Sequence, residues 1–202
     1  LQQGRAGDSR ILQPDSSAAM QRRQFSNHPA VSGITPGFQE LHRAGHRILW
    51  QPGDTLFFTA ALFLLPERNL GLFVAYNRAG VGDARLELLD AILASLGPGR
   101  YWPALPPTVI DSGLSTRLAG HYRSTRTGMT SLEQIFAPFK LVRVREVKSG
   151  VVQIRGLAMA KDAVWVEQSP GVFRDIGSEE IVVFDEDVET GDIWLFEGNA
   201  PA

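Results

Sequence analysis

Apolar residues in the first half of the chain recur in short runs that predict an antiparallel β-sheet. Residues 38–42 and 47–51 flank Ala44-Gly45 and form a predicted hairpin. Residues 57–65 are almost continuously apolar, which predicts a central strand covered on both faces. A turn leads to a further strand at residues 70–76, and connections this short require antiparallel pairing, because parallel strands need a longer crossover.

Helical spacing follows the last of these strands. A helix is expected after Asp83, which can cap it, and Gly97 ends it. Its apolar face comprises Leu86, Leu89, Ile92, Leu93 and Leu96. Prolines between Pro98 and Pro107 then form a stiff linker, and we place a domain boundary near residue 110. Near the N-terminus, residues 1–13 are expected to be a loop and residues 18–25 a short helix.

The remaining residues read as short strands separated by glycine-containing turns. Strands are expected at residues 118–124, 141–147, 151–155, 163–167, 172–176, 181–185 and 193–197, with a helical turn at 132–136. This pattern predicts a small all-β sandwich or barrel. The predicted fold class is therefore α+β, with a partial antiparallel sheet and flanking helices in residues 1–110 and a β-rich domain in residues 111–202.

Composition excludes several classes of function. The 202 residues are 44% hydrophobic and 21% charged with a net charge of −2, so no basic surplus favours nucleic-acid binding. There is no cysteine, which excludes disulfides, zinc–thiolate sites and cysteine nucleophiles. The longest apolar run is about half the length of a membrane span. The chain begins at Leu1 without a methionine or an apolar leader, and we expect any targeting signal to lie upstream.

Three motifs that suggest cofactors have simpler interpretations. Gly80-Val81-Gly82 lacks the third glycine of a dinucleotide-binding turn, because Arg85 stands there and no second parallel strand follows. The acidic run at residues 185–192 lacks the glycine and glutamate of a calcium-binding EF-hand loop and is expected to be a solvated hairpin. His42 and His46 have the spacing of helical metal ligands but lie on a predicted hairpin. We predict no cofactor and no metal.

A search for a catalytic nucleophile is negative. No Ser-x-x-Lys and no Gly-x-Ser-x-Gly occurs, and none of Lys140, Lys148 and Lys161 follows a serine by three residues. A serine hydroxyl without an adjacent base is too weakly acidic to attack a carbonyl carbon. We therefore predict no catalytic residue in this chain and no covalent acyl chemistry by the chain alone.

Several segments resemble the back half of the serine β-lactamase-like hydrolases, a group that includes class C β-lactamases, penicillin-binding proteins, esterases and D-amino-acid peptidases. The most specific segment is the run Leu-Leu-Pro-Glu-x-Asn-x-Gly-x-Phe-Val-x-x-Asn at residues 64–77. Residues 118–124 and 170–173 resemble the β-rich appendage that follows the domain in some members. The resemblance implies a five-stranded antiparallel sheet flanked by helices and a periplasmic or secreted location.

The resemblance also indicates a candidate substrate-binding strand end. In the family this position carries Lys-Thr-Gly or His-x-Gly, whereas alignment on Gly53-Asp54-Thr55 places Gln51-Pro52-Gly53 here. Gln51 can donate a hydrogen bond but carries no charge. The alternative is that these residues only end a strand. The candidate substrate-binding residues are Gln51, Pro52, Gly53, Asp54 and Thr55.

The sequence therefore leaves two functions open. The first is a fragment of a serine hydrolase, whose parent acts on β-lactam, ester or D-amino-acid peptide bonds and whose nucleophile lies in an absent N-terminal half. The second is a non-catalytic binding or scaffold module whose β domain binds a small ligand or a protein. Loss of half a sheet domain exposes an edge, which favours pairing with the missing half or self-association. A monodisperse monomer in light scattering would count against pairing with the missing half and against self-association.

Overall fold

The computed structural model describes residues 2–78, 84–99, 113–123, 141–156, 163–176 and 180–198. The chain divides into two compact units, Leu1–Ala104 and Leu105–Ala202. The boundary predicted near residue 110 lies outside the described residues. In the described parts of both units, strands pair antiparallel throughout and helices are few, so the α+β class with mostly antiparallel sheet is confirmed.

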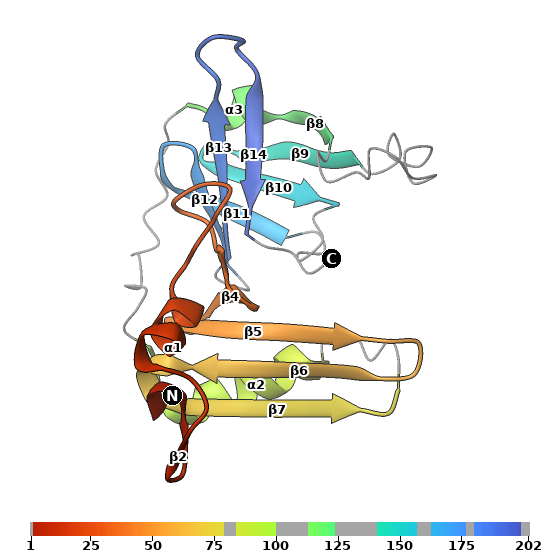
Figure 1. The fold of residues 1–202 in the computed structure, drawn as a ribbon. Helices are drawn as coiled ribbons and strands as arrows, with labels where there is room; N and C mark the ends of the chain where they lie inside the picture. The colour runs from red at the N-terminus through yellow and green to blue at the C-terminus, as the bar shows by residue number, and fades with distance from the viewer. Residues whose placement is uncertain are drawn as a thin grey trace. The chain divides into compact units, whose positions relative to one another are not determined.

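The first unit contains a five-stranded antiparallel sheet whose strands follow one another in chain order (Figure 1). The strands are β3 (Ile34–Thr35), β4 (Phe38–Arg43), β5 (His46–Asp54), β6 (Thr59–Leu65) and β7 (Leu70–Tyr76). The predicted hairpins are confirmed. The central strand begins at Thr59 rather than at Phe57, because Thr55 and Phe58 close the preceding turn through a backbone hydrogen bond of 2.8 Å.

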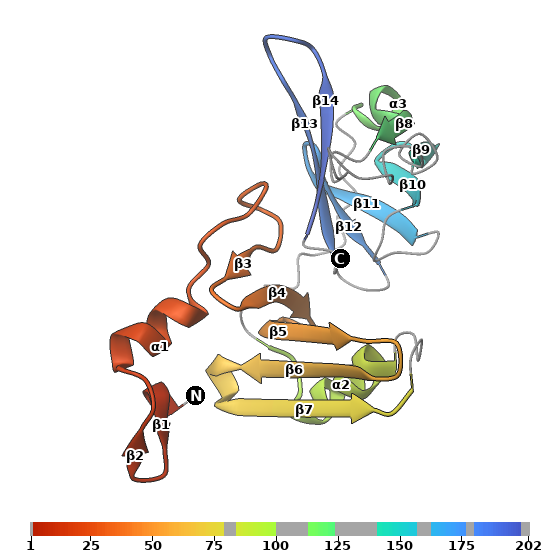
Figure 2. The same ribbon diagram turned by 45° about the vertical axis from the view of Figure 1, so that its right-hand side comes forward.

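The N-terminal segment lies at one end of this sheet (Figure 2). It comprises η1 (Gln2–Gly4), β1 (Arg5–Ala6), β2 (Ser9–Arg10) and α1 (Pro14–Gln21). The prediction of a loop over residues 1–13 was wrong, because β1 and β2 pair as a small hairpin. The helix predicted at residues 18–25 begins earlier, at Pro14, since proline suits a first helical turn, where its missing N–H has no partner to lose.

The two faces of the sheet are covered unequally. Burial alternates along β6, so one face is buried and the other only half-buried. On the buried face Trp50 and Phe63 stack with ring centroids 5.9 Å apart. Helix α2 (Ala84–Leu96) lies on this face with Leu89 and Leu93 fully buried (Figure 1). The prediction that the central strand is covered on both faces was therefore wrong.

Two backbone features fix the ends of the strands. Between β6 and β7, η2 (Pro66–Arg68) ends at Asn69, which adopts a left-handed φ of 50°. At the β4–β5 turn, Gly99 donates a backbone hydrogen bond of 2.8 Å to Ala44. A Cβ on Gly99 would overlap the carbonyl of Gly45, so only glycine allows the segment after α2 to approach this turn.

The second unit is a single curled sheet of seven strands in consecutive order. The strands are β8 (Gly120–Arg123), β9 (Leu141–Lys148), β10 (Val151–Arg155), β11 (Ala163–Ser169), β12 (Val172–Asp175), β13 (Ile181–Glu186) and β14 (Ile193–Glu197). Tyr122 of β8 contacts Phe184 of β13, with ring centroids 5.6 Å apart. Because these strands are far apart in the sheet order, the contact requires the sheet to curl into a nearly closed, barrel-like form.

Large side chains fill the inside of the curled sheet. Trp165, Phe173 and Phe184 are almost completely buried there. The strand predicted from residue 118 begins two residues later, since Ser115–Leu118 forms the short helix α3. The helical turn predicted at residues 132–136 lies outside the described residues. Among the helices that the structure describes, none has the length and apolar character needed to cross a membrane.

Candidate functional site: an open strand edge and an uncovered sheet face

Strand β7 lies at the outer edge of the first unit's sheet (Figure 1). Its inner edge pairs with β6 over all seven residues without a bulge. Within the described ranges, no strand pairs with its outer edge. The seven residues, Leu-Gly-Leu-Phe-Val-Ala-Tyr, carry no charge and include no proline. At the opposite edge β3 is only two residues long.

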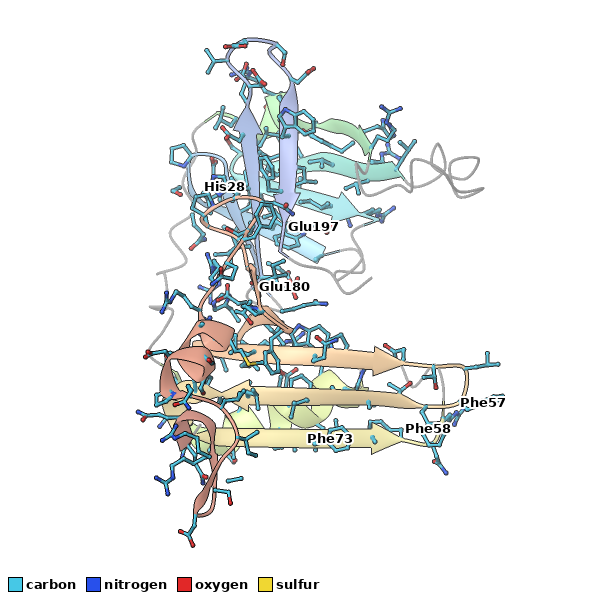
Figure 3. The ribbon with its side chains drawn as sticks, viewed as in Figure 1. His28, Phe57, Phe58, Phe73, Glu180 and Glu197 are labelled. Atoms are coloured by element: carbon cyan, nitrogen blue, oxygen red, sulfur yellow. The ribbon has the colours of Figure 1, made fainter. Side chains whose placement is uncertain are left out.

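The sheet face beside this edge is apolar and partly open. The register places Gln51, Leu62 and Phe73 side by side on the face opposite α2. Phe73 is 68% exposed, which is unusual for a large apolar side chain at the middle of a strand (Figure 3). Gly71 and Ala75, which flank Phe73 on the same face, are also exposed.

The N-terminal segment covers only one end of this face. Ile11, Leu12 and Met20 of that segment approach Phe38 and Leu64 of the sheet around a cavity of about 390 Å³. Phe73 and Ala75, toward the other end of β7, are not among the residues that line the cavity. In the part of the chain that the structure describes, the uncovered part of this face is therefore centred on Phe73.

Helix α2 also carries an exposed apolar side chain. Asp90 of α2 forms an ion pair of 2.7 Å with Arg43 of β4, so Asp90 points away from β7. Leu88 lies two residues earlier, about 200° around the helix, and is therefore on the flank of the helix opposite Asp90. Leu88 is 37% exposed. The first unit thus has an exposed apolar side chain on each side of the sheet, Phe73 on β7 and Leu88 on α2.

The sequence-predicted binding residues lie together at the far end of β5. Gln51, Pro52 and Gly53 pair with successive residues of β6, so their side chains alternate between the two faces. Asp54 forms an ion pair of 3.2 Å with Arg85 of α2, which fixes the start of that helix against the strand. Substrate binding by these residues stays a prediction. In the structure they form the end of β5 and the start of the turn that follows it.

The turn after β5 exposes three consecutive apolar residues. Leu56, Phe57 and Phe58 are 77%, 69% and 56% exposed. Figure 3 labels Phe57 and Phe58 at this turn. The hydroxyl of Thr55 accepts a hydrogen bond of 3.0 Å from the backbone N–H of Phe58. The turn is therefore held by its own hydrogen bonds. The sequence pattern placed Phe57 and Phe58 inside a buried strand, and this prediction was wrong.

A buried ionic cluster holds the segment before β3 against β4. Glu40 is 2% exposed and forms ion pairs with Arg23 at 2.5 Å and with Arg47 at 2.6 Å. The backbone N–H of Gly33 donates a third hydrogen bond of 3.0 Å. Burial alone would raise the pKa of Glu40, but the hydrogen bonds and charges from Arg47, Gly33 and Arg23 lower it below its ordinary value. Glu40 is therefore a buried anion with a structural role.

The same segment contains a serine–histidine pair that sequence analysis missed. The Oγ of Ser32 lies 3.0 Å from Nδ1 of His42. Burial lowers the pKa of His42 to about 4; the Glu40 carboxylate opposes that shift, and the charges of Arg23 and Arg47 add to it. A base this weak provides little driving force for proton abstraction near neutral pH. We therefore assign the pair to structure rather than to catalysis.

The low pKa of His42 predicts that acid destabilises the first unit. The unfolded chain has the ordinary pKa of 6.5 and binds more protons between pH 6.5 and 4 than the folded chain, so stability is lost as the pH falls through this window. From about pH 7 to about pH 5 we expect a loss of about 2 kcal/mol. Urea unfolding at both pH values measures it. The His42→Gln variant should lose much less over this interval, and an equal loss in both proteins would contradict the assignment.

The acidic segment of the second unit forms the predicted hairpin turn. Oδ1 of Asp187 accepts backbone hydrogen bonds from Glu189 at 2.8 Å and from Thr190 at 3.2 Å. The carboxylate thus closes the turn between β13 and β14. The Gly80-Val81-Gly82 motif lies outside the described residues.

Comparison with known proteins identifies no family. No protein-family model and no curated protein matches the chain. A similar solved structure is titled "Crystal structure of SurE with D-Leu" and shares 16% sequence identity at a TM-score of 0.49. The match covers 94% of this chain and 43% of that one, so this chain spans less than half the length of that protein. A likeness this distant carries no argument about fold or function.

These comparisons overturn the assignment to the serine β-lactamase-like hydrolases. No family model matches, those of the β-lactamases and penicillin-binding proteins included, and the similar structure carries the name SurE. The segment that carried the resemblance has a simpler explanation. Pro66 starts a helical turn, Asn69 takes the left-handed conformation, and apolar residues run along β6 and β7 on both sides of the turn. Any antiparallel hairpin with this turn favours such residues. The prediction that this chain is part of a serine hydrolase acting on β-lactam, ester or D-amino-acid peptide bonds is therefore wrong.

Proposed function

We propose that this chain is a protein-association module, whose first unit takes up an extended polypeptide strand along β7. The observation that carries the proposal is a seven-residue apolar strand with no described partner on its outer edge. Backbone N–H and C=O groups along such an edge provide a template for a further strand. The added strand would gain main-chain hydrogen bonds over the whole length of β7.

The composition of β7 supports this proposal. Natural edge strands that stay unpaired are usually short or carry charges, prolines or bulges that prevent pairing. β7 has none of these features, whereas β3 at the other edge is only two residues long. The β3 edge is thus protected against pairing by its short length, whereas β7 has no such protection.

The open face also indicates the side chains that a partner should carry. An added strand would place every second side chain on the face of Phe73, between the exposed Gly71 and Ala75. Side chains directly opposite one another across two strands lie close enough to pack. We therefore expect an apolar or aromatic residue opposite Phe73.

The second unit gives less support for a ligand-binding function. A small barrel can enclose a ligand only where its interior is left open. In the described part of this unit, Trp165, Phe173 and Ile154 are each 1% exposed or less and occupy that interior. This packing favours association of proteins over uptake of a small apolar ligand.

A labelled peptide with alternating threonine and valine tests the proposal. We expect it to slow amide hydrogen exchange in β7 of the full chain, as paired backbone groups are protected. The Ala75→Lys variant should bind it at least about tenfold more weakly, because an edge lysine opposes pairing. Val188→Lys is the matched control, since Val188 is 96% exposed in the second unit. Equal binding by all three proteins, or unchanged exchange in β7, would refute the proposal.

A further inference from the structure

We infer that the strand taken up by β7 is β7 of a second copy of this chain; the inference rests on the proposed function. A twofold axis perpendicular to the sheet would pair the two strands antiparallel and join the sheets edge to edge. The central residue of Leu70–Tyr76 is Phe73, so a full-length pairing is centred on it. Each Phe73 then lies directly opposite its counterpart, and Gly71 lies opposite Ala75 of the second copy.

The side chains on the open face are complementary in this register. Phe73 is exposed, and the residues two positions away on either side, Gly71 and Ala75, are small. In an antiparallel pair a side chain also reaches the residues diagonal to its direct partner. Each phenyl ring can therefore lean over the glycine or alanine of the second copy without a clash. Aromatic side chains opposite one another and beside a glycine stabilise strand pairs.

The helix face is compatible with the same symmetry. A twofold axis perpendicular to the sheet leaves both copies of α2 on the same side of the joined sheet. Leu88, which is 37% exposed on α2, then lies on that side of the joined sheet in each copy. The joined edge would be covered by Phe73 side chains on the face opposite the two helices.

The charges at the ends of the strand predict how the pairing responds to salt. No charge lies within β7, so nothing along the strand repels a second copy. Antiparallel pairing brings η2, which carries Arg68, toward the end of β7 in the second copy, beyond which Arg78 lies, and both arginines are exposed. Repulsion between exposed charges is weak and is screened by salt. Added salt should therefore strengthen the association slightly rather than weaken it.

Disulfide trapping tests the register directly, because the chain contains no natural cysteine. In the Phe73→Cys variant the two introduced thiols would lie on directly opposed residues, about 4.5–5.5 Å apart between Cα atoms, which a disulfide can span. In the control variant Ala75→Cys they would be about 13 Å apart along the strands. Mild oxidation should crosslink Phe73→Cys at least about tenfold faster than Ala75→Cys.

Sedimentation velocity of the unmodified chain completes the test. We expect a monomer–dimer equilibrium whose dimer fraction rises with concentration, and Ala75→Lys should remain monomeric while Val188→Lys behaves as the unmodified chain. Equal crosslinking rates for the two cysteine variants, or a monomer at every concentration, would overturn the inference. If the chain stays monomeric while the alternating peptide still slows amide exchange in β7, the inference of a second copy is wrong and the proposed function stands. If the peptide has no effect either, the proposed function fails as well.

Discussion

Replacing Glu40 with alanine should lower the free energy of unfolding of the first unit by about 3 kcal/mol, one of the two largest effects expected from a single substitution in this chain. The Glu40 side chain is 1% exposed and holds Arg23 and Arg47, whose side chains are 29% and 15% exposed. Removal of the carboxylate leaves two partly buried cations beside each other without a counter-charge. The Gly33 N–H also loses its acceptor. Urea unfolding followed by amide exchange of β4 and β5 would measure the loss.

Two further variants define what the Glu40 experiment means. Glu40→Gln keeps the shape and an acceptor oxygen but removes the charge, so its effect should lie between those of the unmodified chain and Glu40→Ala. Glu67→Gln removes an exposed carboxylate from η2 and should change stability by less than about 0.5 kcal/mol. A Glu40→Ala variant as stable as Glu67→Gln would show that the cluster does not hold the segment before β3 in place.

Phe173→Ala should destabilise the second unit by about 3–5 kcal/mol. Phe173 has no exposed surface, and its ring lies 5.4 Å from that of Phe184 in an edge-to-face arrangement. Loss of the ring removes this contact and leaves a cavity among strands that cannot all close on it. The expected result is an earlier urea transition for amides of β11 to β13, with the transition of β5 and β6 unchanged.

The matched control for Phe173 is Ile176→Ala, which lies three residues later and is 70% exposed. Truncation there removes little buried surface and should change stability by less than about 0.5 kcal/mol. If Phe173→Ala shifted the amides of both units equally, the two units would not unfold independently, and the interpretation of the second unit as a separate core would be wrong.

Many strands were predictable because short runs rich in apolar residues lie between turns that contain glycine or proline. This held for β4, β7 and β10 to β14, whose predicted bounds match the observed strands to within two residues, although burial alternates strictly only along β7 and β12 of this set. The β1–β2 hairpin was missed because its residues are all exposed and polar or small, so no apolar period marks it. Phe57 and Phe58 were placed in a strand because apolar character alone does not separate a strand from an exposed turn.

Predictions for the site depended on contacts that sequence spacing does not reveal. Glu40 meets Arg23 across seventeen positions, and Ser32 meets His42 across ten, because the chain before β3 folds back along β4. No linear motif records either contact. The sequence predicted that a partial sheet would have an open edge. It did not predict that this edge is β7, because the order of the strands in the sheet was not known. The family resemblance was misleading because it depended on residues such as Pro66 and Asn69, which any hairpin turn of this conformation favours.

The consecutive order of strands in the second unit has a consequence for how that unit forms. Each described strand from β9 to β13 pairs with the next described strand along the chain, so most of the sheet contacts of this unit join residues near in sequence. Sheets built from local hairpins fold faster than sheets whose strands must first meet across long stretches of chain. Closure of the curl, which brings Tyr122 to Phe184 and Arg117 to Glu186, is by contrast a long-range step. We expect the refolding rate of this unit to respond most strongly to changes at that ring contact.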